Sequence, residues 1–190
     1  MSDTDTGKPV ERTIEVLVLG LGNVLLGDDG LGAAAVARVE RGYRIPADVH
    51  LEDGGTQGMA LLGMIAESRH VILVDAVRTD DPPGTFVRID GDEVMDAVRN
   101  RLSPHQVGVA DLLDSARLID CYPASVTLLG LVPETIELSV ERTGAVEKGL
   151  DALVEAVVGE VQNLGYTMAR QAHVAGRDHP MRDLAHHFGM

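Results

Sequence analysis

The hydrophobic positions of the chain alternate between short apolar runs and stretches with helical periodicity. Residues 14–19 (IEVLVL) form a β-branched run that ends at glycines, which is typical of a strand buried on both faces. Apolar residues then recur near helical spacing over residues 31–39. The order of strand, glycine-rich turn and helix predicts a βα unit.

The same alternation continues along the chain. Further strands are predicted at residues 49–51, 71–74, 85–89 and 125–132. Further helices are predicted at residues 59–66, 92–99, 104–117 and 146–164. The pattern predicts an α/β fold, a three-layer sandwich with a mostly parallel twisted sheet covered by helices on both faces. Residues 85–89 alternate as a half-exposed strand does, which makes them a candidate antiparallel edge strand.

The pattern also predicts one domain with two tails. Residues 1–12 form a polar, flexible N-terminus, and residues 13–166 form the α/β domain. Residues 167–190 hold four of the seven histidines without a sustained apolar pattern, so we expect a mobile tail. A histidine-rich metal-binding tract is the alternative function for this segment.

Composition and charge narrow the classes of function. The 190 residues are 45% hydrophobic and 24% charged, which is typical of a globular domain. The net charge of −14 repels nucleic acid and anionic membranes, so neither is an expected partner. The chain begins without a secretory signal and has no run of about 18 apolar residues. We therefore expect a cytoplasmic protein. Small acidic proteins of this type can work alone, so we also expect a monomer.

The glycine-rich loop after the first strand does not fit a nucleotide site. The dinucleotide fingerprint requires a third glycine where this chain has Leu25. Asp28 and Asp29 also stand at the predicted helix start, where a phosphate would need the positive end of the helix dipole. These two acids either cap the helix or present oxygen ligands to a cation.

Two further residues are candidate metal ligands. Asp75 follows the strand at 71–74, where it is either a turn residue or a functional acid at the carboxyl end of the sheet. His105 follows Ser103 and Pro104, a typical helix start, where the dipole favours a neutral imidazole that can bind a metal. A lone histidine is more often a surface or core residue. Two carboxylates and one imidazole would leave open positions on nickel or zinc.

Four segments, taken in order, resemble the hydrogenase maturation endopeptidases, which process the large subunit of nickel-iron hydrogenases. They are GLGNVLLGDDGLG at 20–32, DGGT at 53–56, VDA at 74–76 and SPHQ at 103–106. The resemblance runs from about residue 14 to about residue 164.

This resemblance implies a metal-dependent endopeptidase that removes a short C-terminal extension from the hydrogenase large-subunit precursor after nickel insertion. It implies that Asp29, Asp75 and His105 bind the metal and form the catalytic centre. The nickel would be supplied by the substrate as a recognition element, and zinc or cadmium could occupy the site in vitro. The residues that would line the substrate cleft are Asp28, Asp53, Gly54, Gly55 and Thr56.

Alternatives remain open at this point. The DGGT segment is equally well explained as a tight turn after a strand. A non-catalytic nickel-binding chaperone or assembly scaffold for the large subunit would use the same fold and ligands. A nucleotide-binding regulatory domain is disfavoured by the defective phosphate loop.

Overall fold

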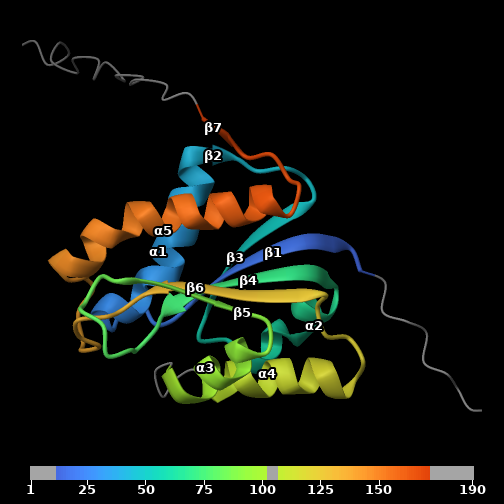
Figure 1. Ribbon diagram of the computed structural model, residues 1–190, viewed down its shortest axis with the longest axis horizontal. Coiled ribbons are helices and arrows are strands. Elements are labelled where there is room, and N and C mark those ends of the chain that lie inside the picture. Colours follow the sequence, from blue (N-terminus) through green and yellow to red (C-terminus); the bar gives the residue numbers. More distant parts are fainter. Residues whose placement is uncertain (1–11, 102–106, 172–190) are drawn as a thin grey trace, which may run out of the picture.

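The centre of the molecule is a five-stranded sheet in the order β3-β1-β4-β6-β5 (Figure 1). The computed structural model describes residues 12–101 and 107–171. Four strands are parallel, and β5 pairs antiparallel with β6 at one edge. The five strands are β1 (Ile14–Leu21), β3 (Val49–Gly55), β4 (Ser68–Ala76), β5 (Phe86–Asp90) and β6 (Ser125–Leu131). The predicted α/β sandwich with an antiparallel edge strand is confirmed.

Helices cover both faces of the sheet (Figure 1). One face carries α1 (Leu31–Gly42) and α5 (Gly144–Asn163). The other carries α2 (Leu62–Ala66), α3 (Glu93–Arg101) and α4 (Val107–Leu118). Two single-turn 3-10 helices, η1 (Gly27–Gly30) and η2 (Gly58–Leu61), lead into α1 and α2. No helix in the described ranges is both long and apolar enough to span a membrane.

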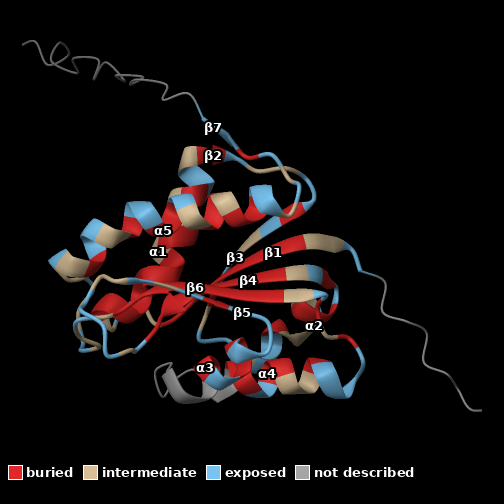
Figure 2. Ribbon diagram, viewed as in Figure 1, coloured by how far each residue is buried: buried red, intermediate tan, exposed pale blue. Residues whose placement is uncertain are grey.

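The central strands are buried on both faces, as their continuous apolar runs predict. In β1, Val16 and Val18 pack in the layer under α1 and α5, whereas Leu17 and Leu19 pack in the layer under α2, α3 and α4. Figure 2 shows this buried centre as red strands between two half-buried helical layers. Because the sheet is covered on both faces, the strand ends and their loops are where polar side chains can reach a ligand.

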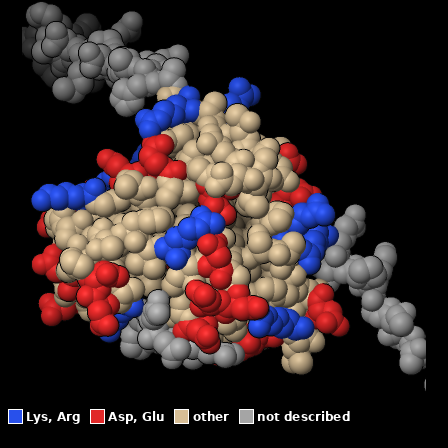
Figure 3. Space-filling model, in the orientation of Figure 1, with Lys and Arg blue, Asp and Glu red and all other residues tan. Residues whose placement is uncertain are grey.

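The carboxyl ends of β1, β4 and β6 meet at one edge of the sheet, at the left of Figure 1. On the face shown in Figure 3, Asp and Glu side chains are spread over much of the surface, and those at this side lie beside Lys and Arg side chains.

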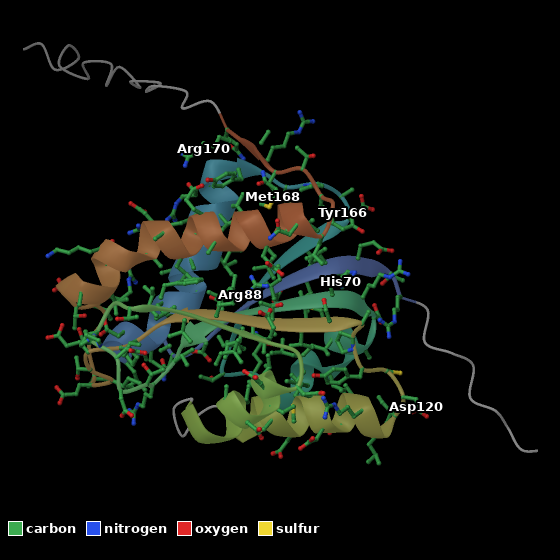
Figure 4. The ribbon with its side chains drawn as sticks, viewed as in Figure 1. His70, Arg88, Asp120, Tyr166, Met168 and Arg170 are labelled. Atoms are coloured by element: carbon green, nitrogen blue, oxygen red, sulfur yellow. The ribbon has the colours of Figure 1, made fainter. Side chains whose placement is uncertain are left out.

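The predicted boundary of the mobile tail, at residue 167, lies too early in the chain, because residues 168–171 are packed against the domain. Met168 is only 3% exposed and belongs to the core under α1 and α5 (Figure 4). Residues Ala169–Arg170 form β7, which pairs antiparallel with β2 (Tyr43–Arg44). The Gln171 amide N–H donates to the carbonyl oxygen of Gly42 at 2.8 Å. The buried Met168 and backbone pairing with residues 42–44 thus hold residues 168–171, a segment too short to show a hydrophobic pattern in the sequence. Residues 1–11 and 172–190 lie outside the described residues.

An ion-pair network fixes the edge strand β5 to α5. Nη1 of Arg88 lies 2.6 Å from Oε2 of Glu160, a residue of α5 that is 8% exposed. Nε of Arg88 also donates to Asp90 at 2.8 Å, and Asp90 accepts from the Thr127 hydroxyl at 2.9 Å. The hydrogen bonds to Glu160 and Asp90 raise the pKa of the Arg88 guanidinium above its usual range. Figure 4 shows Arg88 between the sheet and α5.

Replacing Arg88 by Met should lower the free energy of unfolding by about 1–3 kcal/mol, because the Glu160 carboxylate would stay buried without its partner. Solvent at the guanidinium, whose side chain is 41% exposed, keeps the loss below that of a fully buried pair. The matched control is Arg69→Met, whose pair with Glu15 is more exposed and should contribute under about 0.5 kcal/mol. Urea unfolding measures both; equal losses would contradict the role of Arg88.

Stability should also fall in mild acid because of His70 on β4. Burial, and secondarily the Arg69 charge, lowers the pKa of His70, whose Nδ1 lies 2.8 Å from the Ser125 hydroxyl. The unfolded chain, with a pKa near 6.5, then binds the proton more readily, so stability is lost as pH falls through about 6.5. His70→Asn should flatten the change in urea midpoint between about pH 7 and pH 5. His50→Gln, at a side chain 48% exposed, is the control, and identical slopes for His70→Asn and the parent chain would contradict the assignment.

Candidate carboxylate site at the sheet edge

A close contact at Gly32 sets the position of the candidate site. A side chain at this residue would place its Cβ 2.3 Å from the carbonyl oxygens of Leu21 and Val74. Only glycine therefore lets the first turn of α1 rest directly on the ends of β1 and β4. The preceding turn, η1, is thereby held against β4, with Asp28 and Asp29 at its centre.

The loop from β1 into η1 is equally tight. Gly22 has a φ of +104°, and a Cβ there would lie 1.8 Å from the carbonyl oxygen of Asp29. The turn therefore requires glycine both for its left-handed backbone and for its contact with η1. Gly22 and Gly32 of this loop therefore serve chain packing.

Asp29 is fully buried at 0% exposure, and its two carboxylate oxygens differ in their hydrogen bonding. Oδ2 accepts the backbone N–H of Asn23 at 2.8 Å, so the acid occupies the anion position of the loop as predicted. Among the residues that the structure describes, no donor reaches Oδ1. A buried carboxylate oxygen without a partner is unfavourable by itself and is a natural ligand for a cation.

Asp75 is the last residue but one of β4 and is also fully buried. Its Oδ1 accepts the N–H of Ala76 at 2.7 Å. The register of β1 and β4 pairs Gly20 with Val74, so Asp75 lies at the strand end against which η1 packs. The structure thus brings the predicted residues Asp29 and Asp75 to the same edge.

The third predicted ligand, His105, lies outside the described residues. Within residues 12–101 and 107–171, no three His, Cys, Asp or Glu side chains are placed to hold a metal ion. The described part of the site therefore consists of two carboxylates.

Asp28 does not have the position predicted for a cleft wall. It is fully buried, and its Oδ2 accepts the N–H groups of Glu134 and Thr135 at 2.9 and 3.3 Å and the Thr143 hydroxyl at 2.9 Å. Its Oδ1 accepts the N–H of Thr143 at 2.7 Å. The carboxylate therefore fastens the segment between β6 and α5 to η1, with both oxygens occupied.

The DGGT segment forms the end of β3 and a turn beside β1. Oδ1 of Asp53 accepts the N–H of Gly55 at 3.1 Å, and Gly55 accepts the N–H of Gly22 at 3.1 Å. Gly54 is buried, whereas Asp53 and Thr56 are exposed at the carboxyl edge. The turn is thus present, and its two polar side chains remain accessible beside the loop that holds Asp29.

Two cavities at this edge contain residues that sequence reasoning did not single out. One, of about 410 Å³, is lined by Arg78 and Thr79 after β4 and by residues 132–137 after β6. A second, of about 490 Å³, is lined by Arg78, Thr79, Asp80 and Asp81. The only sequence signal for them is position, since both lining segments follow strands that end at this edge. Through Glu134, the wall of the first cavity is hydrogen-bonded to Asp28.

This combination defines a class of protein: an α/β domain with buried carboxylates, one of them incompletely paired, beside cavities at the carboxyl ends of its parallel strands. Comparison with known proteins gives the family. The hydrogenase maturation protease model matches residues 33–160, and the chain belongs to this family of endopeptidases.

Comparisons with individual relatives support this family assignment. The hydrogenase 2 maturation protease of Escherichia coli K12 is 38% identical over 153 residues, which cover 80% of this chain and 93% of the relative. The solved structure of the maturating endopeptidase HybD from E. coli has a TM-score of 0.80 at 36% identity, covering 83% of this chain and 98% of that one. The [NiFe] hydrogenase maturation protease HybD from Thermococcus kodakarensis has a TM-score of 0.65 at 26% identity, covering 76% and 97%.

Replacing Asp28 by Ala should lower the free energy of unfolding by about 2–4 kcal/mol, because four buried or half-buried donors lose a charged acceptor. Amide exchange at Glu134 and Thr143 should become faster. Thr143→Val, which removes only the hydroxyl hydrogen bond, is the control and should lose about 1 kcal/mol. Unchanged exchange at both amides in Asp28→Ala would contradict the anchoring role.

Proposed function

We propose that this endopeptidase removes a short C-terminal extension from the precursor of a nickel-iron hydrogenase large subunit after nickel has been inserted. The observation that carries the proposal is the buried Asp29, whose Oδ1 has no partner in the described part of the chain and which shares its sheet edge with Asp75. The nickel in the precursor would be the recognition element.

The proposed ligands suit such an ion chemically. Asp29 and Asp75 supply carboxylate oxygens, and His105, two residues before the start of α4, would supply an imidazole. Oxygen and imidazole donors bind first-row divalent metals, and three protein ligands leave positions open for groups of the substrate. Zinc or cadmium should therefore occupy the same donors in vitro.

Charge gives a physical reason for a nickel requirement. A precursor without nickel would close over the unpartnered Oδ1 of the buried Asp29 without supplying a positive charge to it, which is unfavourable. A nickel-loaded precursor would place a divalent cation next to the unpartnered Oδ1 of Asp29 and pair it. Binding of the loaded precursor would also position its chain for hydrolysis.

The relatives support this class of substrate. Those from E. coli and T. kodakarensis carry names that refer to hydrogenase maturation, and the latter specifies [NiFe] hydrogenase. The cavity of about 410 Å³ beside Asp28 offers space for polypeptide at the same edge. We further propose that the protein acts as a monomer in the cytoplasm.

The intact mass of the purified precursor, followed with and without bound nickel, tests the proposal. The parent chain should release one defined C-terminal peptide from the nickel-loaded form only. Asp29→Asn should lower kcat/KM by at least about 100-fold, because a neutral amide is a poor ligand for a divalent cation. Asp48→Asn, at an exposed acid in the loop before β3, is the matched control and should cleave normally.

Two results would contradict the proposal. Equal cleavage of both precursor forms would exclude nickel as the recognition element, and full activity of Asp29→Asn would exclude this carboxylate as a ligand. A stable complex without any change in precursor mass would favour the assembly-scaffold alternative instead.

A further inference from the structure

An exposed apolar surface borders the carboxylate site. It consists of Val24 and Leu25, each 53% exposed, together with Leu138 and Val140, which are 84% and 74% exposed. We call these four side chains the apolar rim. Single exposed apolar residues are ordinary, but a contiguous group at a functional edge is typical of an interaction surface.

Backbone hydrogen bonds hold the two halves of the rim together. Ser139, between Leu138 and Val140, donates its N–H to the carbonyl oxygen of Leu25 at 2.9 Å. Its own carbonyl oxygen accepts the N–H of Gly27 at 2.7 Å, so that Ser139 forms a parallel β-bridge with Leu26. These bonds fix the backbone that carries Leu138 and Val140 against the backbone that carries Val24 and Leu25. The surface is preorganised rather than a loose loop.

The rim is continuous with the site. Asn23, the residue before Val24, donates its N–H to Asp29 at 2.8 Å. A Cβ at Gly30 would lie only 2.9 Å from the Cα of Val24, so the rim backbone rests directly on η1. On the other side of the rim, Ile136 and Glu137, which belong to the segment that carries Leu138 and Val140, line the cavity of about 410 Å³. A chain that reaches the carboxylates along this side would cross the rim.

Acidic side chains flank the rim. Glu134, Glu137 and Glu141 are all exposed on the segment that carries Leu138 and Val140. The nearest base in that segment, Arg142, is paired with Glu147 at 3.1 Å. Such a surface favours a partner with apolar side chains between positive charges.

We propose that the apolar rim binds the stretch of the precursor polypeptide next to the bond that is cut, as an extended segment with apolar side chains flanked by Lys or Arg. This inference rests on the proposed function and specifies how its substrate is held. The rim supplies affinity and register, and the carboxylates act on the metal.

Steady-state cleavage of the nickel-loaded precursor tests the rim, with binding of fluorescently labelled precursor measured in parallel. The double variant Leu138→Ser/Val140→Ser should lower kcat/KM at least tenfold, mainly through KM, and weaken binding by a similar factor. Its melting temperature should stay close to that of the parent chain, because both side chains are exposed. Leu118→Ser, at a side chain 86% exposed at the end of α4, is the control and should match the parent chain.

A charge reversal tests the acidic flank. Glu137→Lys should weaken precursor binding at least fivefold at low salt, and the difference should shrink as salt screens it. Glu40→Lys, at an exposed acid near the end of α1, carries the same change in net charge and should bind as the parent chain does.

The outcomes separate the rim from the proposed function. If the parent chain cleaves the precursor and the double variant does so with an unchanged KM, the rim proposal is overturned while the function stands. If the parent chain cleaves nothing, the function fails, and the binding measurement alone decides whether the rim recognises the precursor. Sedimentation that shows lost self-association with unchanged precursor binding would assign the rim to a second copy and overturn the proposal.

Discussion

The contact between Gly32 and the ends of β1 and β4 is the constraint on which the site depends. Because residue 32 is a glycine without a side chain, the first turn of α1 can rest on the carbonyl oxygens of Leu21 and Val74. This fixes η1 and its two acids at the end of the sheet, beside Asp75. A glycine-rich loop that in other α/β proteins brings backbone close to a phosphate here brings a helix close to a strand end.

Two neighbouring acids on η1 have opposite roles because their surroundings differ. Asp28 accepts four hydrogen bonds and holds a remote segment in place. Asp29 accepts one from Asn23, and no donor in the described residues reaches its other oxygen. Anchoring requires a carboxylate with both oxygens occupied, whereas binding a cation requires an oxygen that is still open.

The segment between β6 and α5 connects the parts of this edge. Asp28 anchors its two ends, one near Glu134 and the other at Thr143. Between these anchors it lines a cavity and then presents Leu138 and Val140 beside the site. A protease that binds a polypeptide benefits from such a fixed surface, since preorganisation lowers the entropic cost of binding.

The sequence by itself determined the α/β architecture, the edge strand β5 and the shared edge of Asp29 and Asp75, because strand and helix periodicities are local and parallel strands end together. Only the tertiary structure decided the role of Asp28, whose partners lie more than 100 residues away. It also decided the packing of Met168 and the pairing of Ser139 with Leu26. Contacts between segments so distant in sequence depend on how the whole sheet closes, and no local pattern records them.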